Sequence, residues 1–137
     1  MALICDTGPL YAAMDRSDRD HATCMHLLEA SGERVAVPAP VVVELDWLAS
    51  QRLQPDAFLA FLSDVEDARL DIVELEVGDY PRIRELIDRY RDLPLGFVDA
   101  AVLTVVERLR ETRLATLDHR HFAIVRPRHV PALRLVP

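Results

Sequence analysis

The sequence predicts a three-layer α/β/α sandwich with a central parallel sheet of about five strands, formed by a single domain over residues 1–137. Short apolar segments alternate with helix-like segments of about 10–15 residues, which is the pattern of right-handed βαβ units. The chain is 50% hydrophobic and 28% charged, so it can fill a core. Its length suits one domain better than two.

Each element has its own signal. Five short apolar segments predict strands, in the order 1–5, 34–37, 70–75, 113–116 and 133–136. Five segments with helical spacing of apolar residues predict helices, at 10–30 (with a polar interruption at 15–20), 41–51, 55–67, 78–91 and 96–111. Residues 6–9, Asp-Thr-Gly-Pro, are typical of a turn that ends the first strand. Pro40 suits the first position of the second helix. The last strand should lie at an edge of the sheet.

Charge and composition exclude several classes of protein. The net charge is −7 and all 16 basic residues are arginine, so the chain has no overall basic surface for nucleic acid and no mechanism that needs lysine. No apolar run reaches the roughly 20 residues of a membrane helix, and no basic region precedes the first apolar segment. We therefore expect a cytoplasmic protein with no membrane partner. Cys5 and Cys24 match no zinc or redox spacing and should be reduced thiols.

Four of the 23 acidic residues are not explained by a solvated surface. Asp6 and Asp118 directly follow predicted strands, whereas Glu44 and Asp99 lie near the starts of helices that follow strands or loops. In a parallel sheet all four positions map to the carboxyl edge. Carboxylates gathered there repel one another and titrate as a coupled set unless a cation joins them. Hard divalent cations such as Mg²⁺ take such ligands, which predicts metal-assisted hydrolysis of phosphodiester bonds.

Neighbouring residues fit the same interpretation, with one alternative left open. Thr7 and Thr116 are placed to hydrogen-bond the carboxylates or a metal-bound water. Asp99 could instead be a capping residue, because it would occupy the third position of a helix that begins near Gly96. Asp99 shares a helical face with Val102, Leu103 and Val106, and we expect this face to be buried with the carboxylate pointing inward.

The remaining polar residues near these motifs have simpler explanations. The other acidic residues, Glu107 among them, are expected on solvated faces. His119 and His121 form a His-x-His pair that could bind zinc, but no further cysteine or histidine supports such a site. Arg120 and His121 are candidates for phosphate contacts, and Arg126 is a further candidate for contact with a substrate.

Four short motifs together resemble a known family. In chain order they are Asp6-Thr-Gly-Pro-Leu, Val-Val-Val-Glu44-Leu-Asp-Trp-Leu, Leu-Gly-Phe-Val-Asp99-Ala and Thr116-Leu-Asp118-His-Arg-His-Phe. Each motif is weak alone, but their order and spacing resemble the PIN domain. More specifically, they resemble the VapC toxins of bacterial type II toxin–antitoxin systems.

The resemblance implies a ribonuclease and its partners. It implies a Mg²⁺- or Mn²⁺-dependent endoribonuclease with a central parallel sheet, and hence an RNA substrate. It also implies a homodimer that a small VapB-type antitoxin neutralises in a heterotetramer or larger complex. The family's metal ligands correspond to Asp6, Glu44, Asp99 and Asp118, and its supporting hydroxyl to Thr116. Some relatives carry a further acid shortly after the fourth, where this chain has His119 and Arg120.

Three competing interpretations were weighed. Response-regulator receivers need a lysine near a strand end, and this chain has none. Aspartate-nucleophile phosphatases place a second aspartate two residues after the first, where this chain has Gly8. The third alternative is a PIN-like binding module that has lost catalysis and acts only through protein partners. Retention of all four acids argues against it.

Overall fold

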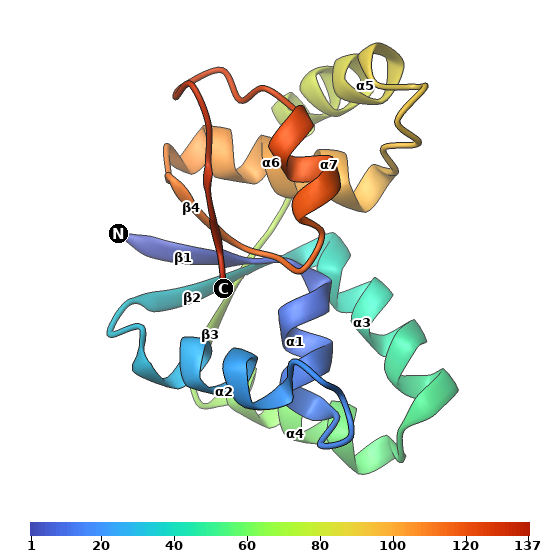
Figure 1. The fold of residues 1–137 in the computed structure, drawn as a ribbon, viewed down its shortest axis with the longest axis vertical. Coiled ribbons are helices and arrows are strands. Elements are labelled where there is room, and N and C mark those ends of the chain that lie inside the picture. The colour runs from blue at the N-terminus through green and yellow to red at the C-terminus, as the bar shows by residue number, and fades with distance from the viewer.

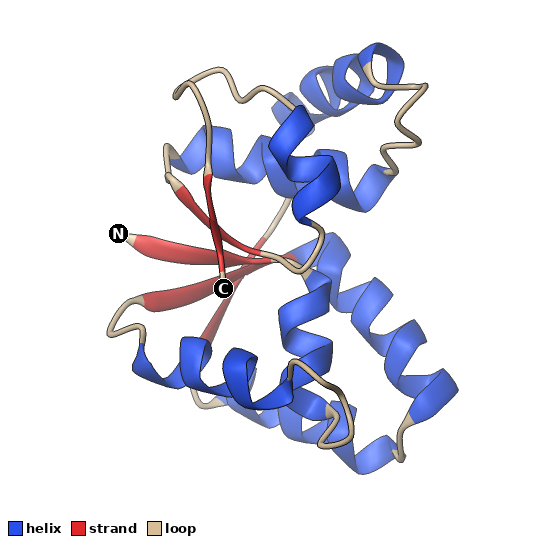
Figure 2. Cartoon of the chain, in the orientation of Figure 1, coloured by secondary structure: helices blue, strands red, loops and turns tan.

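The fold is a five-stranded parallel sheet with helices on both faces (Figures 1 and 2). The computed structural model describes residues 1–137. In the sheet order β3-β2-β1-β4-β5, the strands are Leu70–Val73, Arg34–Pro38, Ala2–Cys5, Arg113–Ala115 and Arg134–Val136. All four strand pairs are parallel. The predicted sandwich is therefore confirmed.

Seven α-helices and one 3-10 turn connect the strands. They are α1 (Thr7–Met14), α2 (His21–Ala30), α3 (Ala39–Arg52), α4 (Pro55–Glu66), η1 (Val77–Asp79), α5 (Tyr80–Arg89), α6 (Phe97–Leu109) and α7 (His119–Ile124). Figure 1 shows α1 to α4 on one side of the sheet and α5 to α7 on the other. No helix is both long enough and apolar enough to cross a lipid bilayer.

Strand β1 occupies the central position of the sheet, and its apolar residues suit a strand that is covered on both faces. Leu3, Ile4 and Cys5 are 0% exposed, as expected for a continuous apolar run in a parallel sheet. Ile4 lies opposite Ala36 of β2 and Leu114 of β4. The carboxyl end of β1 is therefore flanked by the ends of both neighbours, which brings together the loops that follow them.

Helix α6 is the most deeply buried helix. Every residue from 100 to 106 is buried, so the predicted apolar face that includes Val102, Leu103 and Val106 is only part of its contact surface. The helix packs against α3, α5 and β2. Its N-terminal turn, which carries Asp99, is thereby held in place by the core. The helix ends at Arg110, which adopts a left-handed conformation with φ of 55°.

The turn predicted over residues 6–9 is wrong, because helix α1 begins there directly. Asp6 is the N-cap and Pro9 lies in the first turn, where the missing N–H of proline leaves no hydrogen bond unmade. Gly8 also lies in this turn. A Cβ there would stand 3.3 Å from Cβ of Leu117, so the glycine lets the loop after β4 pack closely against α1.

Other predictions differ from the structure at element ends. Helix α7 was not predicted, and the predicted strand 70–75 ends at Val73. The predicted helix 78–91 is divided between η1 and α5. On α4, Phe61 is buried, but Leu59 and Leu62 of the same apolar stripe are exposed. Short loops and partly exposed stripes carry too weak a periodicity to fix such details.

The expected solvated position of Glu107 is also wrong. Its side chain is only 9% exposed and is bound by the buried Arg82 guanidinium, with Nε–Oε2 and Nη2–Oε1 distances of 2.9 and 2.8 Å. Nearby, Nε of Arg108 donates to Oδ1 of buried Asp79 at 3.0 Å. The backbone N–H of Arg128 also donates to Glu107. An arginine network thus ties α5, α6 and the C-terminal segment together.

Candidate metal centre

Asp6 and Thr116 are placed side by side by the register of the sheet. Cys5 of β1 lies opposite Ala115 of β4, so the next residue of each chain segment begins the loop at the carboxyl edge. The hydroxyl of Thr116 donates to Oδ2 of Asp6 at 2.9 Å, and both residues are buried. This is the contact anticipated for a hydroxyl that supports a carboxylate.

The carboxyl group of Asp6 is poorly stabilised in its charged form. Burial raises its pKa from the ordinary value of 3.8 to about 7. The backbone amide of Thr7 and the hydroxyl of Thr116 lower the pKa, whereas the charges of Asp99 and Glu44 raise it further. None of these main contributions comes from a basic side chain. The site therefore gathers negative charge and supplies little to neutralise it.

Asp99 lies on α6, two residues after its first residue, with Gly96 as the N-cap. Burial raises the pKa of its carboxyl group, and the charges of Asp118 and Glu44 raise it further. The charge of His121 and the backbone of Gly96 act in the opposite direction. The backbone contribution fits the capping alternative, but the larger effects come from burial and from the other carboxylates. Asp99 thus occupies a capping position within an acidic cluster.

Asp118 is held by the first turn of α7, of which it is the N-cap. Its Oδ1 accepts from the backbone N–H of His121 at 3.1 Å, and its Oδ2 lies 2.6 Å from Nδ1 of the same histidine. Its own backbone N–H donates to Oγ1 of Thr116 at 3.0 Å. One hydroxyl therefore contacts both Asp6, as a donor, and Asp118, as an acceptor.

The tightest group of potential ligands is Asp99, Asp118 and His121. One ligand atom from each lies within 4.8 Å of the other two, and all three side chains are partly exposed. Of the four predicted acids, Asp6 and Glu44 do not join such a group. They lie close enough to Asp99 and to each other to raise pKa values at the site.

From the sequence, His121 is expected to contact phosphate or to form half of a His-x-His pair. The structure separates that pair. Nε2 of His119 lies 3.1 Å from the backbone oxygen of Thr116, whereas His121 turns to Asp118. The spacing of three residues between Asp118 and His121 could have signalled this, because residues i and i+3 share a face of a helix. The short helix itself was not predicted, so the signal was missed.

Glu44 reaches the cluster from α3, on the border of an apolar groove. It is half-buried and lines the groove of about 740 Å³ with Trp47, Tyr80 and Phe97. Trp47 follows Glu44 by three residues on α3, but it is 62% exposed and is not part of the core. The acidic cluster therefore opens on one side toward exposed aromatic side chains.

The residues present fit a divalent cation. Carboxylate oxygens dominate the set, and such oxygens are the preferred ligands of Mg²⁺ and Mn²⁺. The hydroxyl oxygen of Thr7, next to Asp6, is buried and has no hydrogen-bond partner, which leaves it free for a ligand or for water. A cation would offset the mutual repulsion of Asp6, Asp99 and Asp118.

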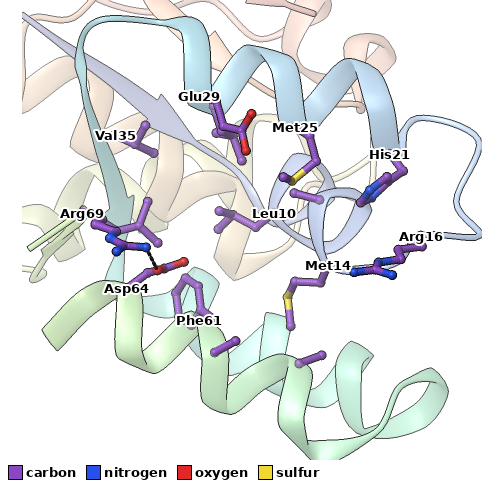
Figure 3. Close-up of a pocket in the computed structure, with 15 residues that line it drawn as sticks. Leu10, Met14, Arg16, His21, Met25, Glu29, Val35, Phe61, Asp64 and Arg69 are labelled. Carbon is purple, nitrogen blue, oxygen red and sulfur yellow. Dashed lines mark hydrogen bonds and ion pairs between the residues drawn. The ribbon is translucent and has the colours of Figure 1, made fainter. Parts of the chain in front are cut away.

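A second groove lies away from the carboxylates, between α1, α2 and α4. Figure 3 shows Leu10, Met14, Met25 and Phe61 lining it. Its volume is about 660 Å³, and ten of its fifteen lining residues are hydrophobic. No member of the acidic cluster lines it. This groove therefore has a different character from the site at the sheet edge.

Comparison with known proteins places the chain in a family. Residues 3–126 match the PIN domain. The chain is 31% identical over 125 residues to ribonuclease VapC26 of Mycobacterium tuberculosis, which covers 91% of this chain and 93% of that protein.

Two solved structures share the fold. The crystal structure of VapC20 of Mycobacterium tuberculosis, a sarcin-ricin loop cleaving toxin, matches with a TM-score of 0.79 and 18% identity, over 94% of this chain and 98% of the other. The structure of VapBC2 of Rickettsia felis, bound to a DNA fragment from its promoter, matches with a TM-score of 0.68 and 19% identity, over 98% and 97% of the two chains. The chain therefore belongs to the PIN domain family and, within it, to the VapC ribonucleases.

Proposed function

We propose that this protein is a metal-dependent endoribonuclease that acts as the toxin of a VapBC-type toxin–antitoxin pair. The observation that carries the proposal is the buried carboxyl group of Asp6, whose pKa is raised to about 7 beside Asp99 and Glu44. The relationship to ribonuclease VapC26 supports the same activity. Such a toxin would act in the cytoplasm, where its RNA substrate and its antitoxin are found.

The proposed ligands of the cation are Asp6, Glu44, Asp99 and Asp118. Mg²⁺, or Mn²⁺ in its place, supplies Lewis acidity that activates water and stabilises the leaving oxygen of the phosphodiester. Within the protein, the hydroxyl of Thr116 orients Asp6 and the loop that holds Asp118. The hydroxyl of Thr7 is proposed to bind a water of the metal site.

Local arginines are proposed to guide the RNA, because the net charge of −7 opposes it. Arg120 and Arg126 are exposed and lie in or next to α7, close in sequence to Asp118. A guanidinium group suits bidentate contact with a phosphate. These two residues are thus the proposed contacts to the RNA backbone.

Cleavage of RNA by the purified protein tests the proposal. We expect cleavage with Mg²⁺ or Mn²⁺, none after EDTA, and none with Asp6→Asn or Asp99→Asn. Asp46→Asn is a matched control, because Asp46 is an exposed acid two residues from Glu44. Circular dichroism should show that all variants are folded. Activity that survives both Asp6→Asn and Asp99→Asn would refute the assignment.

The alternative of an inactive binding module makes a different prediction. A module without a metal site would show no increase in melting temperature when Mg²⁺ or Mn²⁺ is added. The active enzyme should show such an increase, because a ligand that binds only the folded state stabilises it. Asp99→Asn should reduce it.

An apolar segment of the antitoxin is proposed to bind in the groove between α1, α2 and α4. The apolar lining of this groove suits a nonpolar segment, and the net charge of −7 suits a partner that is basic elsewhere. Ala60→Arg would fill the groove from an exposed position on α4. Its neighbour Leu59 is 56% exposed and does not line the groove, so Leu59→Arg is the control. Only Ala60→Arg should weaken binding of the co-expressed antitoxin.

A homodimer, and a heterotetramer or larger complex with antitoxin, completes the proposal. The exposed apolar residues nearest the groove beside Glu44 are Val43, Trp47, Tyr80 and Phe97, with exposures of 73, 62, 51 and 43%. Adjacent exposed apolar side chains of this kind are typical of protein interfaces. Light scattering of wild type and Trp47→Arg should show a dimer and a monomer, respectively.

A further inference from the structure

His121 lies close to two of the proposed metal ligands, Asp99 and Asp118. It forms the group with Asp99 and Asp118 in which ligand atoms lie within 4.8 Å of one another. Its backbone N–H donates to Oδ1 of Asp118, which fixes the first turn of α7. The imidazole ring is 25% exposed, so it is partly enclosed but can be reached from solvent.

The geometry of this pair resembles that of adjacent metal ligands. Nδ1 of His121 and Oδ2 of Asp118 are 2.6 Å apart and share a hydrogen bond. Two neighbouring ligands in an octahedral shell with bonds of about 2.1 Å are separated by about 3 Å. A small increase in this separation would therefore allow both atoms to bind one cation in place of the hydrogen bond. Coordination of a metal by imidazole requires the neutral ring.

The neighbouring histidine lacks this arrangement. Nε2 of His119 lies 3.1 Å from the backbone oxygen of Thr116, and the side chain is not part of the ligand group. His119 and His121 are thus both histidines in the first turn of α7, and both are close to Asp118 in sequence. They differ in whether a ring nitrogen faces the acidic cluster, which makes His119 a matched control.

We propose that His121 is a nitrogen ligand of the divalent-cation site, alongside Asp99 and Asp118, and that it makes the site favour Mn²⁺ over Mg²⁺. The inference rests on the proposed function. Imidazole is a softer ligand than carboxylate and suits transition metals, whereas Mg²⁺ prefers oxygen ligands and water. A mixed set of oxygen and nitrogen ligands should therefore discriminate between the two ions.

Pulsed electron paramagnetic resonance of the Mn²⁺-loaded protein tests the proposal directly. A coordinated imidazole nitrogen gives ¹⁴N coupling to the Mn²⁺ electron spin, independent of catalysis. We expect this coupling in wild type and His119→Ala but not in His121→Ala. Bound Mn²⁺ without nitrogen coupling in wild type would overturn the inference and leave the metal site intact. Absence of Mn²⁺ binding would also overturn the inference, whereas absence of binding by both Mn²⁺ and Mg²⁺ would refute the proposed function.

Metal affinity gives a second readout that separates coordination from mere orientation of Asp118. If His121 is a ligand, His121→Ala should weaken Mn²⁺ binding by roughly 10-fold or more, with much less change for Mg²⁺. If the ring only orients Asp118, both affinities should fall equally, and the inference would be wrong. Calorimetric titration of wild type, His119→Ala and His121→Ala with each ion distinguishes these results.

Discussion

The two ends of α6 each carry a carboxylate that is at least partly buried, but only the carboxylate at the C-terminal end is paired with an arginine. At the C-terminal end, the guanidinium of Arg82 contacts Glu107 through two hydrogen bonds. At the N-terminal end, Asp99 faces Asp118 and Glu44, and its pKa is raised. The C-terminal end of α6 thus pairs Glu107 with an arginine, which stabilises the fold. The N-terminal end instead places Asp99 near other carboxylates, where a metal is proposed to bind.

This difference has an energetic consequence. Removing the cationic partner of a buried carboxylate is strongly destabilising, so the contact between Arg82 and Glu107 should contribute substantially to the stability of the fold. Acids that lack a cation reduce stability until one binds. The candidate metal centre thus costs the fold some stability, in the way expected of a functional site. Substitutions at the two ends of α6 should have opposite effects on stability and activity.

The largest expected effect is on catalysis at the N-terminal end. Asp99→Asn should lower kcat/KM for RNA cleavage by roughly 1,000-fold or more, because it removes a charge that would hold the metal. Glu107→Gln, at the other end of the same helix, should stay active at a temperature where it is folded. Comparable loss of activity in both folded variants would contradict the division between the two ends.

The next effect is on stability at the C-terminal end. Arg82→Met should lower the free energy of unfolding by roughly 3–5 kcal/mol, because it leaves Glu107 without its buried partner. Urea denaturation followed by circular dichroism measures this. Replacing both partners, as in Arg82→Met with Glu107→Leu, should recover part of the loss. No recovery in the double variant would mean that the pair itself does not carry the effect.

A smaller effect of opposite sign is expected at Asp6. Its folded pKa of about 7 exceeds the ordinary 3.8, so the folded state binds the proton more tightly than the unfolded state. The contribution of this group to stability is full below pH 3.8 and is lost as pH rises toward 7. Asp6→Asn should therefore stabilise the metal-free protein by roughly 2–4 kcal/mol above pH 7.

Thermal unfolding in EDTA at several pH values measures the effect of Asp6→Asn. The stabilisation should vanish below about pH 3, where the carboxyl group is protonated in both states. It should also shrink when Mn²⁺ is added, because the cation stabilises only the wild-type carboxylate. A variant that is less stable than wild type in EDTA at pH 8 would contradict the assigned direction of the pKa shift.

The smallest effect concerns the C-cap of α6. Arg110 adopts a left-handed conformation with φ of 55°, which glycine adopts at lower cost. Arg110→Gly should raise the free energy of unfolding by about 0.5–1 kcal/mol, measured by urea denaturation. It should leave metal affinity unchanged, since Arg110 lies at the far end of the helix from Asp99. Altered metal affinity would show that the two ends are coupled.

Much of the fold could be predicted because its signals are local. The apolar run before Asp6 and the alternation of strands and helices predicted a parallel sheet. Because Asp6 and Asp118 each follow a predicted strand, they were expected at the same carboxyl edge of that sheet. The roles of the four acids as metal ligands remain predictions. Local patterns could not show the partners of residues distant in the chain. Arg82 and Glu107 have the sequence context of a solvated helix, and only packing of α5 on α6 buries them.

Details of the candidate site were missed for a similar reason. The tetrad that begins at Asp6 has turn composition, but the same residues also suit a helix start, with Asp6 as the N-cap of α1 and Pro9 in its first turn. Helix α7 is too short for its periodicity to stand out. The position of His121 beside Asp118 follows from that helix, so the histidine could not be assigned to the cluster from sequence alone.

Gly8 has a consequence that reaches beyond its own helix. A methyl group there would meet Leu117 at 3.3 Å, and Leu117 immediately precedes Asp118. The first turn of α1, which follows Asp6, therefore packs closely against the loop after β4, which leads to Asp118. An added methyl group at position 8 would require Leu117, and with it the start of the segment that carries Asp118, to move by a few tenths of an ångström. The absence of a Cβ atom at position 8 therefore helps to set how closely the segments that carry Asp6 and Asp118 pack together.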